Sequence, residues 1–272
     1  KGYIEGYYGR LLSWKSREFL VQKLASLGLD FYIYAPKEDP YHRIKWFDLY
    51  PESEIKNFEK FLKLSTNEGI KTYFTVSPGL TFGKKRASDF NTLTQKLSQL
   101  LEIGYENFGI LLDDLDVEKS ETLGESHADL INRVSEFLKR SGDTSLIFCP
   151  TIYCNQFTKG DLANSSYLKG LSSVVSSEFP LLWTGKQVVS DTISNEDIQE
   201  LKSVISNPVI VWDNYYANDY CPSRFFIGEY SGRSFTEEQA MGVGINPTGS
   251  PLTDAIILDQ FDGKNYIKFL IK

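Results

Sequence analysis

The sequence predicts a single α/β domain of the (β/α)8, or TIM, barrel class, because eight short apolar segments alternate with longer amphipathic ones along the chain. The expected strands are residues 2–7, 31–35, 71–76, 108–113, 145–149, 179–183, 209–212 and 242–245. A doubly wound sheet usually has fewer strands and a glycine-rich phosphate turn after the first strand. The first turn here reads Glu5-Gly6-Tyr7-Tyr8-Gly9-Arg10, which does not fit that turn. The pattern therefore favours the barrel.

Amphipathic segments that follow the strands predict the helices of the barrel. They are residues 16–27, 53–68, 91–103 and 127–140, a weaker one near Tyr167, residues 195–205, one beyond Tyr220, and residues 251–270, which would close the ring. A chain of 272 residues without a long low-complexity tract can bury the core of one large domain, so we expect residues 1–272 to form one unit. Because the chain starts at Lys1 inside an expected strand, we also expect it to be a fragment of a longer protein.

Charge and cysteine content disfavour several classes of partner and cofactor. The net charge is -7, from 36 acidic and 29 basic residues without a basic cluster, which disfavours nucleic acid as a partner. The three cysteines, Cys149, Cys154 and Cys221, lack metal-site spacing with His42 and His127, so neither a disulfide framework nor a zinc site is indicated. No apolar run approaches the roughly 20 residues of a membrane span. We therefore expect no cofactor and no membrane partner, and the odd cysteine count favours a reducing compartment.

The chemistry of a barrel lies where its strands end, and the strongest signal of this kind is in residues 108–116. This apolar strand carries Asp113, Asp114 and Asp116 at its tip. Carboxylates so close together raise the pKa of at least one of them, which would supply both an acid and a base. Two alternatives are a helix N-cap beside solvated loop acids, and a divalent-metal site. The metal site lacks partner histidines and a second carboxylate group at a defined spacing.

A second polar segment, residues 212–220, combines amides, acids and aromatic rings in one loop. That mixture suits the hydroxyl groups and the flat face of a sugar. The alternative is a turn of Asn and Asp residues whose neighbouring aromatics cover the edge of the core. Lys37, Tyr153 and Trp183 also follow expected strands and have the same ambiguity taken singly. Their shared position at one end of the barrel favours a common site.

These segments resemble glycoside hydrolase family 84, which contains O-GlcNAcases and bacterial hyaluronidase-type β-N-acetylglucosaminidases. The similarity runs in order through residues 4–10, 34–43, 77–79, 112–116, 149–154, 182–185, 212–220 and 246–247. One departure is Ile152, where animal O-GlcNAcases carry an acid. The resemblance implies a retaining exo-β-N-acetylglucosaminidase without a cofactor.

The resemblance also implies roles for the acidic cluster. Asp113 would hold the N–H of the substrate's 2-acetamido group, and Asp114 would act as general acid and then as general base. Asp116 would tune this pair. The acetamido oxygen would attack the anomeric carbon to form an oxazoline, which water then opens with net retention. Adjacent carboxylates on one strand tip suit this substrate-assisted route, which is a recognised exception among two-carboxylate glycosidases.

The remaining positions of the family pattern would contact the sugar. The resemblance places Gly6 and Lys37 on sugar hydroxyls or the acetamido side, Tyr153 near the acetamido carbonyl, Trp212 and Asn214 in the pocket wall, Asp219 on O4 and O6, and Asn246 on another hydroxyl.

The substrates implied are O-GlcNAc-modified proteins or glycans that carry β-linked N-acetylglucosamine. The first would suit a cytoplasmic or nucleocytoplasmic location, and the second a secreted enzyme of the bacterial type. A different class of hypothesis is a non-hydrolysing, carbohydrate-binding barrel, which would keep Trp212 and Asn214 without needing a paired acid and base. The helical region that follows the barrel in the family, and that the resemblance implies helps to form a dimer, is absent from this sequence. Any homodimer is therefore expected to form through regions outside it.

Overall fold

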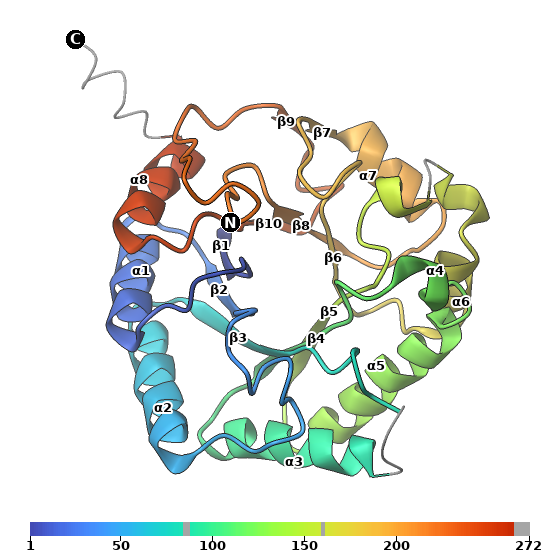
Figure 1. Ribbon diagram of the computed structural model, residues 1–272, viewed down its shortest axis with the longest axis horizontal. Coiled ribbons are helices and arrows are strands. Elements are labelled where there is room, and N and C mark those ends of the chain that lie inside the picture. Colours follow the sequence, from blue (N-terminus) through green and yellow to red (C-terminus); the bar gives the residue numbers. More distant parts are fainter. Residues whose placement is uncertain (84–87, 159–160, 264–272) are drawn as a thin grey trace.

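The computed structural model describes residues 1–83, 88–158 and 161–263, and these form a closed barrel of eight parallel strands (Figure 1). Around the ring the order is β1 (Gly2–Glu5), β10 (Gly242–Ile245), β8 (Val209–Asp213), β6 (Leu181–Trp183), β5 (Ser145–Cys149), β4 (Asn107–Leu111), β3 (Lys71–Val76) and β2 (Phe31–Tyr34). Pairing of β1 with β10, where Tyr3 lies opposite Ile245, closes it. The predicted barrel is confirmed, and each expected strand is present with small shifts at its ends.

Helices surround the barrel as the sequence predicts (Figure 1). They are α1 (Trp14–Ser26), α2 (Glu52–Asn67), α3 (Asp89–Glu102), α5 (Gly124–Lys139), α6 (Ser166–Val174), α7 (Asn195–Lys202) and α8 (Pro251–Asp262). Side-chain caps fix three of their starts: Ser13 accepts from the backbone N–H of Ser16 before α1, Ser165 accepts from that of Leu168 before α6, and Ser194 forms a capping box with Asp197 at α7. Residues 264–270 of the last expected helix lie outside the described residues.

Five short elements have no counterpart in the prediction. They are α4 (Val117–Ser120), two 3-10 helices, η1 (Asn155–Thr158) and η2 (Leu162–Asn164), and a two-stranded sheet of β7 (Ile193–Ser194) and β9 (Arg233–Ser234). All of them lie in connections between the barrel strands, and β7 with β9 joins two connections that are far apart in sequence.

The helix expected beyond Tyr220 is wrong, since the described connection between β8 and β10 contains no α-helix. Pro222 and Gly232 interrupt any helical run there. The aromatic residues of this connection pack on one another instead, as Tyr216 does on Phe226 with ring centroids 5.7 Å apart. The result is a long loop at the carboxyl ends of the strands, free of helical geometry.

Buried apolar side chains form two separate clusters. The larger one joins strands to helices, for example through the T-shaped contact of Phe58 in α2 with Phe74 in β3. The smaller one includes Ile4, Leu111 and Ile210, and none of its buried members lies on a helix, so it fills the interior of the barrel. Because successive strand residues point to opposite faces, a residue two positions beyond an interior side chain also faces the barrel axis.

Candidate active site

The inward-facing rows of the barrel continue past the strand ends into one cavity of about 390 Å³, within the range typical of small-molecule sites. Asp113, for example, lies two positions beyond the interior residue Leu111, and Lys37 lies two beyond Ala35. The same spacing of two aims seven side chains or backbone positions at the cavity: Gly6, Lys37, Asp113, Cys149, Thr184, Asn214 and Asn246. Its other lining residues are Tyr8, Asp114, Tyr153, Val188, Val189, Trp212, Ala217, Asp219 and Tyr220.

Asp114 reaches the cavity by a different route, because a residue adjacent to Asp113 would point away from it in a continued strand. Its φ of +56° lies in the left-handed region, where it stands alone among the described non-glycine residues. Aspartate tolerates this conformation better than most residues, at a cost of about 1–3 kcal/mol. The turn brings a second carboxylate into the same cavity, with its side chain 25% exposed against 7% for Asp113.

Lys37 lies between these two acids and is buried. Its ammonium forms ion pairs with Asp113 and, at 3.1 Å, with Asp114. One buried cation thus partly neutralises two carboxylates. This pairing lowers the free-energy cost of burying their negative charges.

The environment separates the pKa values of the two carboxyl groups. Burial raises the pKa of Asp113 and outweighs the opposing effect of Lys37. Burial also acts to raise the pKa of Asp114, but Lys37 and the hydroxyl groups of Tyr8 and Tyr153 hold it below its usual value. The two adjacent carboxyl groups therefore differ in pKa, and Asp114 is held as a carboxylate by its donors.

Asp113 keeps one oxygen without a hydrogen-bond donor. Its Oδ2 pairs with Lys37, while Oδ1 is buried and has no partner among the described residues. A buried acceptor in this state costs about 1–3 kcal/mol. A ligand that donates an N–H or O–H at this point would recover that energy.

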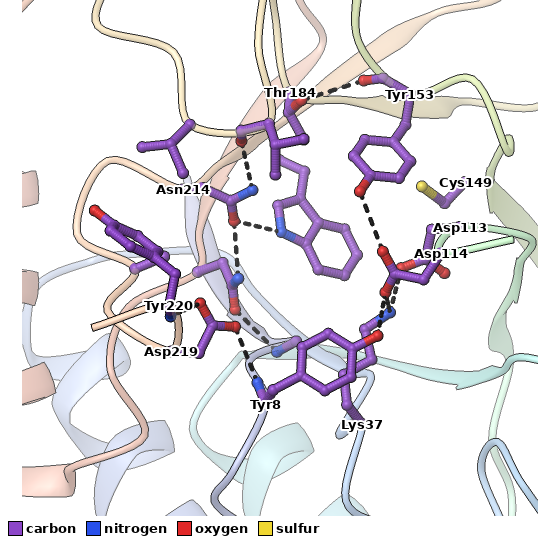
Figure 2. A pocket seen from close by; sticks show the side chains of 16 residues that line it. Tyr8, Lys37, Asp113, Asp114, Cys149, Tyr153, Thr184, Asn214, Asp219 and Tyr220 are labelled. Atoms are coloured by element: carbon purple, nitrogen blue, oxygen red, sulfur yellow. Dashed lines mark hydrogen bonds and ion pairs between the residues drawn. The ribbon is translucent and has the colours of Figure 1, made fainter. Parts of the chain in front are cut away.

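Asp114, in contrast, has donors on both oxygens (Figure 2). The hydroxyl of Tyr153 donates to Oδ1 at 3.1 Å, and the hydroxyl of Tyr8 donates to Oδ2 at 2.5 Å. With Lys37 also on Oδ2, the carboxylate is held from three directions.

The opposite wall of the cavity is a chain of amide contacts. Asn246 accepts from the backbone N–H of Gly6 at 3.0 Å and donates to Asn214 at 2.8 Å. The same Asn214 oxygen accepts from the Trp212 indole at 3.0 Å, and its amide nitrogen donates to the carbonyl of Val188 at 2.7 Å. A Cβ on Gly6 would lie 2.1 Å from the indole ring, so glycine is required for this close approach.

Asp219 lies at the mouth of this wall and is half-buried. Its two oxygens accept from the backbone N–H groups of Tyr8, at 3.1 Å, and of Tyr220, at 3.0 Å. Both oxygens keep further acceptor capacity, since an ionised carboxylate has about four lone-pair sites. Asp219 is therefore equipped to bind hydroxyl groups of a ligand.

The structure brings together both predicted catalytic acids and all seven predicted binding residues, and each lines the cavity. Asp116 is elsewhere: it caps α4, accepts from the Lys119 backbone at 3.3 Å and pairs with the Lys119 ammonium at 2.6 Å. Its expected tuning of the acid pair stays a prediction. Trp183 does not line the cavity either, because it lies one position before the inward-facing Thr184 and packs in the layer between strands and helices.

Sequence reasoning missed seven lining residues: Tyr8, Cys149, Thr184, Val188, Val189, Ala217 and Tyr220. Cys149 and Thr184 carried a signal, since both continue an inward-facing row. Val188, Val189 and Ala217 carried none, because small apolar loop residues look alike in a sequence.

The described residues contain no group of three or more His, Cys, Asp or Glu side chains arranged to hold a metal ion. Within the same residues, every helix is too short or too polar to cross a bilayer.

Fold and site together define a (β/α)8 barrel with an acid pair at the tip of β4 beside a cavity lined by acids, amides and aromatic rings. The chain belongs to the β-N-acetylglucosaminidase family, whose model matches residues 1–261. It is 32% identical over 255 residues to the Protein O-GlcNAcases of Mus musculus and Rattus norvegicus. The match covers 90% of this chain but 28% of those proteins. A solved mutant of the Thermobaculum terrenum O-GlcNAc hydrolase is 30% identical, with a TM-score of 0.88, over 98% of this chain and 58% of that one.

Proposed function

We propose that this barrel is the catalytic unit of a retaining exo-β-N-acetylglucosaminidase in which the substrate's own acetamido group is the nucleophile. The observation that carries the proposal is the unpartnered Oδ1 of Asp113 in the cavity. An acetamido N–H is a donor that would satisfy it. Once bound in this way, the acetamido oxygen becomes the better nucleophile, since a carboxylate that accepts the N–H stabilises the positive charge that develops on the amide.

The two acids would then act in sequence. The acetamido oxygen attacks the anomeric carbon while Asp114, in its protonated form, donates its proton to the departing oxygen. An oxazoline forms, water gives a proton to Asp114 and opens the ring, and the anomeric configuration is retained. A direct carboxylate nucleophile would require the two acids on opposite faces of the sugar, whereas Asp113 and Asp114 extend from one strand tip.

The proposed substrate is N-acetylglucosamine on Ser or Thr of proteins, in the cytoplasm or nucleus. Support comes from the relatives described as Protein O-GlcNAcase and O-GlcNAc hydrolase. Comparison of an O-GlcNAc-modified protein with free β-linked N-acetylglucosamine oligosaccharides tests this choice. Faster turnover of the oligosaccharides would favour a glycan substrate and a secreted enzyme.

Substitution of each acid by asparagine tests the assigned roles. Asp114→Asn should keep measurable activity on aryl N-acetylglucosaminides with an acidic leaving group and lose activity on a serine-linked sugar, because only the poor leaving group needs protonation. Asp113→Asn should lose about 10²–10³ in kcat on both substrates, and it should bind a thiazoline mimic of the oxazoline less well. The opposite pattern would exchange the roles. Full activity in either variant would place the catalytic pair elsewhere, and Asp143→Asn, at an exposed position before β5, is the control.

A further inference from the structure

Tyr8 spans the mouth of the cavity between two acids on opposite walls. Its backbone N–H donates to Asp219, and its hydroxyl donates to Asp114 at 2.5 Å (Figure 2). The residue is 38% exposed, so its ring lies between the cavity and solvent. It is the position at which a group attached to a sugar in the cavity would approach Asp114.

The backbone of Tyr8 and its ring are held by different groups. Asp219 holds its N–H, and Glu38 accepts from the next N–H, that of Gly9, at 2.8 Å. The ring contacts two cations, Lys37 at 5.8 Å and Arg43 at 5.5 Å from its centroid, in addition to its hydroxyl bond. Cation–π contacts contribute about 0.5–2 kcal/mol each, so these two contacts do not prevent the ring from moving while the loop stays in place.

The hydroxyl of Tyr8 stabilises the wrong protonation state for an incoming substrate. A general acid must carry a proton, but the carboxyl group of Asp114 accepts from Tyr8, Tyr153 and Lys37. That arrangement fits the carboxylate, whose pKa is correspondingly held down by these groups against the effect of burial. Substrate binding must therefore remove at least one of the donors.

We propose that Tyr8 is a displaceable positioning residue for the general acid: its hydroxyl holds Asp114 as a carboxylate in the free enzyme, and the glycosidic oxygen of the substrate takes its place. The inference rests on the proposed function. Asp114 gains a proton from solvent as the tyrosine withdraws, and it gives that proton to the departing oxygen. After the aglycone leaves, the hydroxyl returns and orients Asp114 to accept a proton from the attacking water. When the product leaves, Asp114 returns the proton taken from water to the solvent, so the cycle consumes one water molecule and no other reagent.

Tyr8 is the donor most suited to this movement. Lys37 is buried and also pairs with Asp113, and Tyr153 is 8% exposed, against 38% for Tyr8. The other groups that face Asp114 are the carboxyl of Asp113 and the thiol of Cys149, whose pKa is raised by burial so that it stays neutral. None of these changes in a Tyr8→Phe variant, which removes one hydroxyl and keeps the ring.

The test is the pH dependence of Tyr8→Phe on a serine-linked substrate. The kcat/KM profile reports the free enzyme, whereas kcat reports the complex. Loss of the donor should raise the pKa of Asp114 in the free enzyme, so the basic limb of kcat/KM should move upward by about one pH unit, the scale of a charge-assisted hydrogen bond. The basic limb of kcat should not move, because the substrate has already displaced the hydroxyl.

Tyr153→Phe is the matched comparison, since it removes a hydroxyl from the other oxygen of the same carboxylate. It should shift both limbs together, because Tyr153 stays in place when substrate binds. Equal shifts of both limbs in Tyr8→Phe would make Tyr8 a static partner and would overturn the inference, as would no shift in either. If the wild-type protein hydrolyses no N-acetylglucosaminide, the proposed function fails and this inference fails with it, whereas wild-type turnover with unmoved limbs rejects the role of Tyr8 alone.

Discussion

Two walls of the cavity differ in charge and in how their polar groups are paired. The carboxylate wall (Lys37, Asp113 and Asp114) places three charged groups in contact and leaves one oxygen without a donor. The amide wall (Trp212, Asn214 and Asn246) contains neutral groups that largely bind one another. The difference indicates two roles: the carboxylate wall can change its protonation state, and the amide wall keeps a fixed shape.

The structural features that support the two walls also differ. The carboxylate wall depends on the left-handed backbone of Asp114, which stores strain. Behind the amide wall, the buried carboxylate of Asp213 binds Arg233 through two hydrogen bonds of 2.7 Å. Arg233 also donates to the carbonyl groups of Ser190 and Asp191, at 3.0 and 2.9 Å. This ion pair ties the loop after β6 to the long loop after β8, and both loops line the cavity.

The largest change in stability that we predict follows from loss of the ion pair between Arg233 and Asp213. Arg233→Ala should lower the free energy of unfolding by about 3–5 kcal/mol, because it leaves the buried carboxylate of Asp213 without its cation. Urea denaturation measures this change. Activity per folded molecule should fall much less than in Asp113→Asn, since Arg233 does not line the cavity.

The control is Lys56→Ala, which breaks an exposed pair with Glu52 on α2 and should hardly change stability. Similar losses in the two variants would show that burial of the Asp213 pair does not stabilise these loops. A loss of activity as large as that of Asp113→Asn would remove the distinction between the walls.

A smaller effect is expected at the mouth of the amide wall. Asp219→Ala should weaken both substrate and inhibitor by about tenfold to a hundredfold, the usual scale for lost hydrogen bonds to a charged group. Inhibition constants measured beside KM test this, with Glu229→Ala on the same loop as the control, because Glu229 is exposed and does not line the cavity. Near-normal inhibitor affinity in Asp219→Ala would exclude this carboxylate from sugar binding.

Periodicity predicted the barrel, whereas the residues of the amide wall were assigned through the family resemblance; the structure shows that the same periodicity accounts for their direction. Alternation of two along each strand fixes which residues face the axis, and the same rule that buries Leu111 directs Asp113 into the cavity. The same alternation predicts that Thr184 faces the cavity and that its neighbour Trp183 points outward.

The features that the sequence did not predict lie in loops, where side chains do not alternate with a regular period. The left-handed φ of Asp114 depends on contacts with Lys37, Tyr8 and Tyr153, which come from three other strand ends. The helix expected beyond Tyr220 was wrong because aromatic packing within the loop and the pairing of β9 with β7, from the preceding connection, decide its shape. Tertiary contacts of this kind are not encoded in a local pattern.

The smallest effect that we predict is for removal of divalent ions, which should leave the activity unchanged. Between Asp113 and Asp114, the place where a metal would compensate charge is taken by the ammonium of Lys37, and the described residues offer no cluster of three metal-binding side chains. Hydrolysis of an aryl N-acetylglucosaminide should therefore proceed at the same kcat/KM after exhaustive dialysis against EDTA, and added Mg²⁺, Mn²⁺ or Zn²⁺ should not increase it. Loss of activity with EDTA and recovery with one of these ions would mean that the carboxylate wall binds a metal in place of Lys37. The acid pair would then be a pair of ligands, and its assigned roles in proton transfer would have to be withdrawn.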